Sequence, residues 1–176
     1  MQQLKELILG GVRSGKSRLA EQRASTSASE VLYVATARDE GDAELRERIA
    51  QHRARRPAAW HLIEEPIGLA AVLEAHAAPG RCLLIECLTL WLTNLLIASP
   101  AVLRRERDAF QSVLPRLPGH IIIVSNETGL GVIPADELSR RFVDEMGTLH
   151  QWLAAVCERV TLMVAGLPLT LKDVVR

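Results

Sequence analysis

The stretch "GGVRSGKS", residues 10–17, constrains the fold of this chain more strongly than any other segment. Gly10, four further residues, Gly15, Lys16 and Ser17 match the pattern G-x-x-x-x-G-K-[ST]. An apolar run precedes the stretch and a helical pattern follows it. Glycines let the backbone turn several N–H groups toward phosphate oxygens, and a helix presents its positive N-terminus to the same anion. We therefore expect a phosphate-binding loop between a buried strand and a helix.

The side chains of this loop predict how it would bind a nucleotide. Lys16 would place its charge on the β- and γ-phosphates, and the Ser17 hydroxyl can hold Mg²⁺. A metal of this kind needs an acidic partner at the end of a nearby strand, and Glu86 ends the apolar run "LLIE". We expect Mg²⁺ at Ser17 and Glu86. The alternatives are a tight turn with an incidental lysine, and a carboxylate that meets solvent or caps the next helix.

Short apolar runs alternate with longer helical patterns along the whole chain. Several runs are continuously apolar, which is typical of strands buried on both faces of a parallel sheet. The clearest helix spans 136–157, with Asp136 as its N-cap and one apolar face (Leu138, Phe142, Met146, Leu149, Leu153, Val156). The alternation predicts one α/β domain over 1–176, with helices on both faces of a mainly parallel sheet. The expected strands are residues 4–9, 31–36, 61–64, 82–86, 121–125, 160–165 and 169–171.

Composition narrows the classes of protein. The 176 residues contain 21 basic and 21 acidic side chains, so a chain-wide positive field for nucleic acid or membrane is absent. Three cysteines without a CxxC pair argue against disulfides and zinc and favour reduced thiols in the cytoplasm. The apolar run 82–98 is interrupted by Glu86 and Asn94 and is too short to span a bilayer comfortably. We expect a cytoplasmic protein without a membrane span.

Ligands of open parallel sheets bind beyond the carboxyl ends of the strands, so the residues there are candidates for chemistry. "YVATA", residues 33–37, ends a strand in small residues that allow a ligand close approach. "IIIVSNETGLG", residues 121–131, ends in Ser125, Asn126 and Glu127. Glu127 could orient a nucleophile or stabilise its own loop, and the sequence favours neither.

The stretch "ERIAQHRARRP", residues 47–57, surrounds one histidine with arginines. In a helix capped by Asp42, the side chains of Leu45, Ile49 and His52 share the face that points into the protein. The arginines scatter around this helix among glutamates, whereas a nucleic-acid-binding helix would gather them on one face. His52 is therefore either a buried structural histidine or a neutral imidazole that attacks phosphate beside charge-neutralising arginines. Spacing does not decide between the two.

Taken together, the segments resemble the bifunctional adenosylcobinamide kinase/adenosylcobinamide-phosphate guanylyltransferase family of cobalamin biosynthesis. The resemblance spans nearly the whole chain and is far more specific than the phosphate loop alone. His150 departs from it, because the family commonly has asparagine before Gln151. The matching stretches are "GGVRSGKS", "YVATA", "RIAQH" with the following "RP" and Trp60, "LLIECLTLWLTNLL", "VSNETGLGVIP", "RRFVDEMGTLHQ" and "LPLTLK".

This resemblance implies a P-loop NTPase fold of the RecA-like kind and two reactions. ATP or GTP would phosphorylate adenosylcobinamide, and a histidine matching His52 would then pass GMP from GTP to adenosylcobinamide phosphate. It further implies a homo-oligomer, which could be a trimer. The implied catalytic residues are His52 and Lys16. The implied nucleotide contacts are Gly10, Gly11, Val12, Arg13, Ser14, Gly15, Lys16, Ser17, Ala35, Thr36, Ala37, Arg53, Ala54, Arg55, Arg56, Glu64 and Glu86.

Two other hypotheses remain open at the level of sequence. One is a simple P-loop small-molecule kinase in which His52 is structural. The other is a nucleotide-gated binding module or nucleic-acid ATPase that uses the arginines. We expect no nucleic-acid partner, and we expect adenosylcobinamide, its phosphate, GTP and ATP as the molecules bound.

Overall fold

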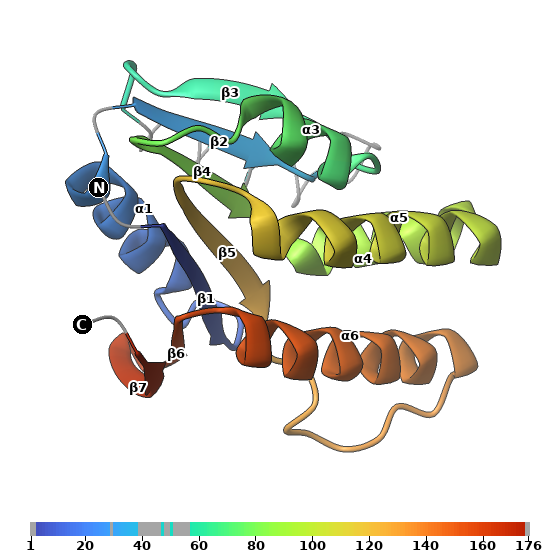
Figure 1. The fold of residues 1–176 in the computed structure, drawn as a ribbon. Helices are drawn as coiled ribbons and strands as arrows, with labels where there is room; N and C mark the ends of the chain where they lie inside the picture. Colours follow the sequence, from blue (N-terminus) through green and yellow to red (C-terminus); the bar gives the residue numbers. More distant parts are fainter. Residues whose placement is uncertain (1–2, 29, 39–46, 48–49, 51–56, 175–176) are drawn as a thin grey trace.

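A seven-stranded sheet forms the centre of the molecule (Figure 1). The computed structural model describes residues 3–28, 30–38, 47, 50 and 57–174. Its strands lie in the order β3-β2-β4-β5-β1-β6-β7. The strands are β1 (Leu4–Gly10), β2 (Glu30–Ala35), β3 (His61–Glu64), β4 (Arg81–Glu86), β5 (His120–Asn126), β6 (Arg159–Val164) and β7 (Leu167–Asp173). The described helices are α1 (Lys16–Ser27), α3 (Leu69–His76), α4 (Leu88–Ala98), α5 (Pro100–Val113) and α6 (Glu137–Val156), with the 3-10 helix η1 (Leu114–Arg116).

Strands β1 to β6 are parallel, which confirms the mainly parallel sheet. Every predicted strand is present, with ends that differ by one or two residues. Two details were wrong. Ala165, expected in the sixth strand, lies in a turn with φ 52°. The last strand is longer than predicted and runs antiparallel to β6, because Ala165 and Gly166 close a hairpin.

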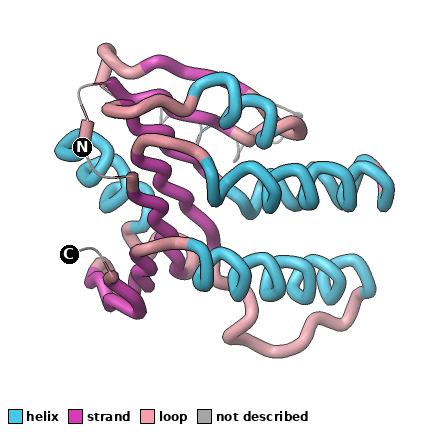
Figure 2. The backbone as a smooth tube through the Cα atoms, viewed as in Figure 1, coloured by secondary structure: helices cyan, strands magenta, loops and turns pink. Residues whose placement is uncertain are grey.

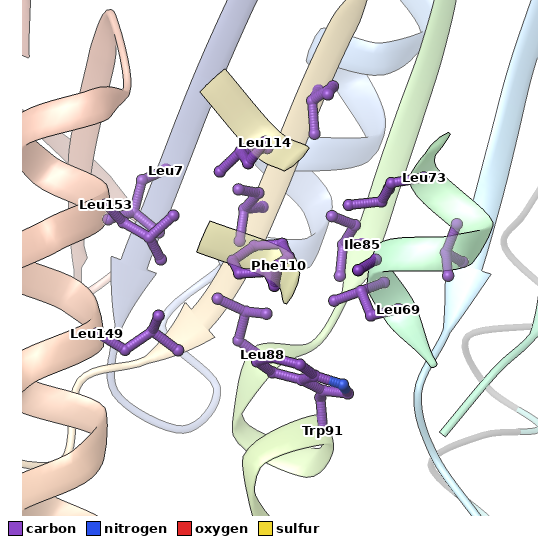
Figure 3. Close-up of a cluster of buried hydrophobic side chains, with 14 of the residues drawn as sticks. Leu7, Leu69, Leu73, Ile85, Leu88, Trp91, Phe110, Leu114, Leu149 and Leu153 are labelled. Carbon is purple, nitrogen blue, oxygen red and sulfur yellow. The ribbon is translucent and has the colours of Figure 1, made fainter. Parts of the chain in front are cut away.

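Helices cover both faces of the sheet, unequally, as Figure 2 shows. On one face, Ala20 and Ala24 of α1 pack against Ile8, Leu84 and Ile122. On the other, helices α3 to α6 bury a larger cluster (Figure 3). Phe110 of α5 lies at its centre, with ring centroids 5.3 Å from Trp91 and 6.1 Å from Trp152. Because the buried residues of α1 are small, this helix can lie close to the sheet at the end of a short loop. The helices on the opposite face carry larger buried side chains.

The predicted N-cap of α6 is confirmed. The Asp136 carboxylate accepts a hydrogen bond of 2.8 Å from the backbone N–H of Ser139. Leu138, expected on the buried face, is 56% exposed, so that part of the prediction was wrong. The first turn of α6 precedes the contact with the core, which begins at Phe142. None of the described helices has the length and apolar character needed to cross a membrane.

Candidate active site

The glycine-rich loop joins the carboxyl end of β1 to α1, as predicted. Gly10 has φ 152°, and a Cβ there would lie 2.5 Å from the backbone oxygen of Met163 on the neighbouring strand β6. Gly15 has φ 98°, in the left-handed region that glycine tolerates best. Val12 and Arg13 are exposed at the tip of the loop. The loop is thus pressed against β6 at its start, with its tip open to solvent.

Lys16 and Ser17 begin α1 and face the sheet edge. The Lys16 side chain is largely buried, and its Nζ donates a hydrogen bond of 2.7 Å to the carbonyl of Gly11. This contact holds the ammonium over the loop. The Ser17 hydroxyl donates a hydrogen bond of 2.8 Å to Oε1 of Glu86, which ends β4. Residues 69 positions apart in the sequence are therefore joined at the carboxyl edge of the sheet, as the sequence predicted.

The pair formed by Ser17 and Glu86 suits a magnesium ion in chemistry. Mg²⁺ prefers oxygen ligands, keeps several waters, and takes one or two protein oxygens together with substrate phosphates. A hydroxyl and a carboxylate at hydrogen-bond distance beside a phosphate-binding loop meet that requirement. No group of three or more histidine, cysteine, aspartate or glutamate side chains occurs as a metal cluster among the residues that the structure describes. A metal here would depend on the phosphates for its remaining ligands.

The end of β2 supports Glu86 from the other side. Ala35 pairs with Glu86 in register, and the N–H of Thr36 donates to the Glu86 carbonyl at 3.1 Å. The Thr36 hydroxyl donates to the Cys87 carbonyl at 2.7 Å and accepts from the Cys87 N–H at 2.9 Å. Asn94 of α4 donates to the Thr36 carbonyl at 2.8 Å. Thr36 is fully buried, so these bonds give it a role in holding the strand ends together.

Other predicted contacts are not brought to the loop or lie outside the described residues. Glu64 is exposed at the end of β3, four strands from β1, which corresponds to about 19 Å at the usual strand spacing. Ala37 is half-buried just beyond β2. The predicted nucleophile His52 and its neighbours Arg53, Ala54, Arg55 and Arg56 lie outside the described residues.

The structure adds a polar group that sequence reasoning did not assemble. His150 of α6 places Nε2 2.8 Å from the Ser125 hydroxyl and Nδ1 3.7 Å from Oε2 of Glu127. Burial lowers the pKa of His150, and the nearby Glu127 carboxylate opposes that shift. The N–H of Glu127 donates to the Gly10 carbonyl at 3.1 Å, which ties the group to the loop. The sequence signal for this group was the position of His150 next to the apolar face of α6, which could have indicated a buried histidine.

Known proteins resemble this chain over nearly its whole length. The family model described as "Cobinamide kinase / cobinamide phosphate guanyltransferase" matches residues 6–171. A bifunctional adenosylcobalamin biosynthesis protein, CobP, of Pseudomonas aeruginosa is 61% identical over 170 residues, covering 96% of this chain and 98% of the relative. The protein of that description from Escherichia coli, CobU, is 35% identical over 180 residues, covering 94% of this chain and 98% of the relative.

Solved structures resemble the chain in fold. An ATPase of a bacterial type III secretion system aligns with a TM-score of 0.53 at 12% identity, covering 95% of this chain and 56% of the other. A Pyrococcus horikoshii protein aligns with a TM-score of 0.56 at 7% identity, covering 98% of this chain and 87% of the other. These identities are low, so the likeness concerns the fold, and it confirms the P-loop NTPase architecture expected from the sequence.

Proposed function

Because the chain belongs to the cobinamide kinase/cobinamide phosphate guanyltransferase family, we propose that it phosphorylates adenosylcobinamide and then converts the phosphate to adenosylcobinamide-GDP. ATP or GTP is the phosphate donor of the first reaction, and GTP is the GMP donor of the second. The family match over residues 6–171 carries this proposal. The contact between Ser17 and Glu86 beside the phosphate loop supports it.

In the kinase reaction, this chain's residues bind and orient the triphosphate. Backbone N–H groups of residues 10–17 surround the phosphates, and Lys16 neutralises charge on the transferred group. Ser17 and Glu86 are the residues that would hold Mg²⁺, which shields the phosphate oxygens when it is bound. Ala35 and Ala37 close the far side of the nucleotide near Glu86, and Glu64 contributes from the end of the neighbouring strand β3. Thr36, which is fully buried, holds the strand ends together and does not contact the nucleotide itself.

In the guanylyl transfer, His52 is the nucleophile. An imidazole nitrogen forms a bond to the α-phosphorus of GTP, and the bond to the pyrophosphate oxygen breaks with the electron pair leaving on pyrophosphate. The resulting phosphoramidate is labile, which suits an intermediate that passes its nucleotide on. The phosphate of adenosylcobinamide phosphate then attacks the same phosphorus and releases the histidine. Arg53, Arg55 and Arg56 neutralise the charge that builds on the phosphate oxygens.

The test is covalent labelling. Wild-type protein is incubated with Mg²⁺ and GTP labelled at the α-phosphate, then denatured and examined for bound label. We expect an acid-labile, alkali-stable adduct that is absent in His52→Ala and retained in His61→Ala, since His61 is exposed on β3. In a parallel assay with adenosylcobinamide and γ-labelled ATP, Lys16→Ala should lose at least about a hundredfold in rate.

The outcomes separate the hypotheses. Wild-type protein without an adduct under turnover conditions contradicts guanylyl transfer through His52. If phosphorylation of adenosylcobinamide persists in that case, the chain is a simple kinase with a structural His52. Strong, salt-sensitive binding of oligonucleotides would instead favour the nucleic-acid ATPase hypothesis.

A further inference from the structure

Ser125, Glu127 and His150 form a cluster beside the phosphate loop that the proposed function leaves without a role. Ser125 lies near the end of β5, Glu127 follows that strand, and His150 lies on α6. Strand β5 runs between β1, which leads into the loop, and β4, which ends in Glu86. Glu127 therefore emerges between the phosphate loop, at the end of β1, and Glu86, at the end of β4. The Glu127 N–H bond to the Gly10 carbonyl fixes its backbone there.

Hydrogen bonds connect the members of the cluster. The buried Ser125 hydroxyl lies 2.8 Å from Nε2 of His150, and the imidazole tautomer decides which of the two donates. The same hydroxyl lies 3.5 Å from the Met146 sulfur, a weak acceptor. The other ring nitrogen, Nδ1, is on the side of Glu127.

The Nδ1 atom faces a carboxylate. Nδ1 of His150 lies 3.7 Å from Oε2 of Glu127, too long for a hydrogen bond. Glu127 Oε1 already accepts a bond of 2.6 Å from the Gly129 N–H, whereas Oε2 has no hydrogen bond among the described residues. The imidazole therefore borders the carboxylate on the side of Oε2 and limits where that oxygen can point.

Burial favours the neutral form of His150 near pH 7, because it lowers the pKa of the imidazole. Glu127 is the charged group that acts on it, and Ser125 from β5 and Met146 from α6 complete its described polar surroundings. An ionised carboxylate with one free oxygen, next to a phosphate loop, can accept a proton from a nearby hydroxyl.

We propose that Glu127 is the general base of the kinase reaction and that His150 is the residue that positions and tunes it. The acceptor hydroxyl gives its proton to Oε2 of Glu127, and its oxygen forms a bond to the γ-phosphorus. The bond from that phosphorus to the β,γ-bridging oxygen breaks, and the electron pair leaves with the nucleoside diphosphate. This proposal rests on the kinase half of the proposed function and does not involve His52.

Glu127→Gln keeps an acceptor for the Gly129 N–H and removes the basic oxygen. We expect its rate of adenosylcobinamide phosphorylation to fall by about 10² to 10³. Labelling by GTP and the urea midpoint of unfolding should stay near wild type, since neither depends on this base. Glu137→Gln, on the exposed first turn of α6, loses the same charge and should leave the kinase rate unchanged.

His150→Asn tests whether His150 alters the basicity of Glu127, because asparagine can still donate a hydrogen bond to Ser125 but does not titrate. Protonation of His150 at acid pH places a positive charge beside Glu127 and weakens it as a base, so the acid limb of the kinase pH profile should move to lower pH in the variant. The rate near pH 8 should change only a few-fold. A purely structural His150 would alter the rate at all pH values and leave the limb in place.

Two results would overturn the proposal and are distinguishable from failure of the proposed function. A kinase rate in Glu127→Gln within a few-fold of wild type removes Glu127 as the base. An unshifted acid limb in His150→Asn removes His150 as its tuning partner. Absence of kinase activity in the wild-type protein itself contradicts the proposed function, and this inference with it.

Discussion

At the scale of single residues, the two glycines at the start of the phosphate loop illustrate how differently neighbouring positions can be constrained. Gly10 has φ 152° and so little space that a Cβ would meet the Met163 oxygen and the Ser14 hydroxyl. A Cβ at Gly11 would meet nothing within 4 Å. The sequence pattern requires glycine at position 10 and leaves position 11 variable, but it does not say what surrounds either residue. The contact of Gly10 with β6 therefore comes from tertiary packing that the pattern does not describe.

We expect Gly10→Ala to destabilise the protein by about 2–4 kcal/mol, because a backbone oxygen 2.5 Å away must move and φ is unfavourable for alanine. Gly11→Ala should change stability by about 0.5 kcal/mol or less, as at other unconstrained surface positions. Urea unfolding of both variants measures this difference. Equal stability of the two variants would contradict the crowding inferred at Gly10.

At the scale of elements, α5 shows how local signals and packing combine. Ser99 precedes the helix, and its hydroxyl accepts a bond of 3.2 Å from the Val102 N–H. Pro100 occupies the first turn, where its missing N–H is not needed. Further along, Phe110 is fully buried among the aromatic rings of the larger core cluster. The cap starts the helix, and Phe110 attaches it to the sheet.

Ser99→Ala should cost about 1 kcal/mol, because the Val102 N–H loses its capping oxygen. Ser99→Gly should cost a few tenths of a kcal/mol, since glycine is tolerated at N-caps. A matched control is Ser25→Ala on α1, where the exposed hydroxyl bonds back to the Glu21 carbonyl. Thermal unfolding compares the three. A Ser99→Ala variant as stable as Ser25→Ala would show that the cap does not stabilise α5.

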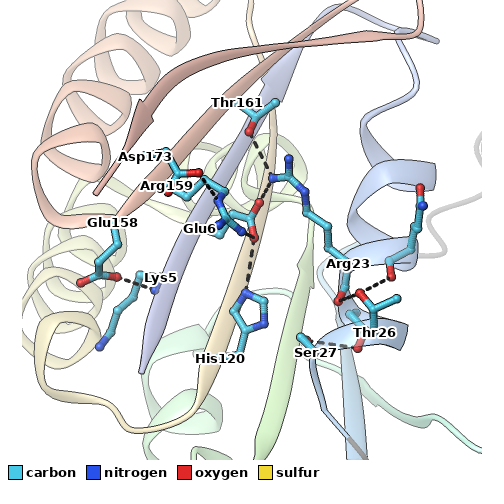
Figure 4. Close-up of polar contacts among 12 residues, drawn as sticks. Lys5, Glu6, Arg23, Thr26, Ser27, His120, Glu158, Arg159, Thr161 and Asp173 are labelled. Atoms are coloured by element: carbon cyan, nitrogen blue, oxygen red, sulfur yellow. Dashed lines mark hydrogen bonds and ion pairs between the residues drawn. The ribbon is translucent and has the colours of Figure 1, made fainter. Parts of the chain in front are cut away.

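At the scale of the whole molecule, the two edges of the sheet carry different chemistry. The phosphate loop occupies the carboxyl edge. At the amino edge, a cavity of about 230 Å³ is lined by Glu6, Arg23, Arg81, His120 and Arg159. The Glu6 carboxylate is fully buried, pairs with Arg23 and with Arg159 at 3.8 Å, and lies 3.4 Å from Nε2 of the His120 imidazole (Figure 4). This group links α1, β1, β5 and β6 electrostatically.

Burial, with Arg159 and Arg23 nearby, lowers the pKa of His120 to about 4. The unfolded chain has a histidine pKa near 6.5 and takes up a proton first as the pH falls, so stability decreases between about pH 6.5 and 4. The shift corresponds to a loss of at most about 3 kcal/mol.

His120→Gln should reduce the change in the free energy of unfolding between about pH 6.5 and 4, whatever its effect on stability at pH 8. His61→Gln, at an exposed position, should leave the curve unchanged. Urea unfolding at several pH values between 4 and 8 measures both slopes. A His120→Gln curve parallel to that of wild type would remove His120 as the source of the acid sensitivity.

Local patterns and the family resemblance predicted much of this protein. The phosphate loop, the strand positions and the α6 cap depend on neighbouring residues, so composition and spacing along the chain were enough to identify them. Leu138 was placed wrongly because periodicity reports which side of a helix is apolar, and does not report where the helix meets the core. The role of His52 remains a prediction, since that residue lies outside the described part of the chain.

The order of amino acids established which side chains could bind phosphate, and the packing of the whole chain selected which of them meet. Ser17 reaches Glu86 because only one strand, β5, lies between β1 and β4 in the sheet. No local sequence pattern predicts this strand order. Glu127 meets His150, and Glu6 meets His120, for the same reason. Contacts between distant segments arise from the packing of the whole sheet and its helices, whereas a motif reflects the conformational preferences of a few adjacent residues.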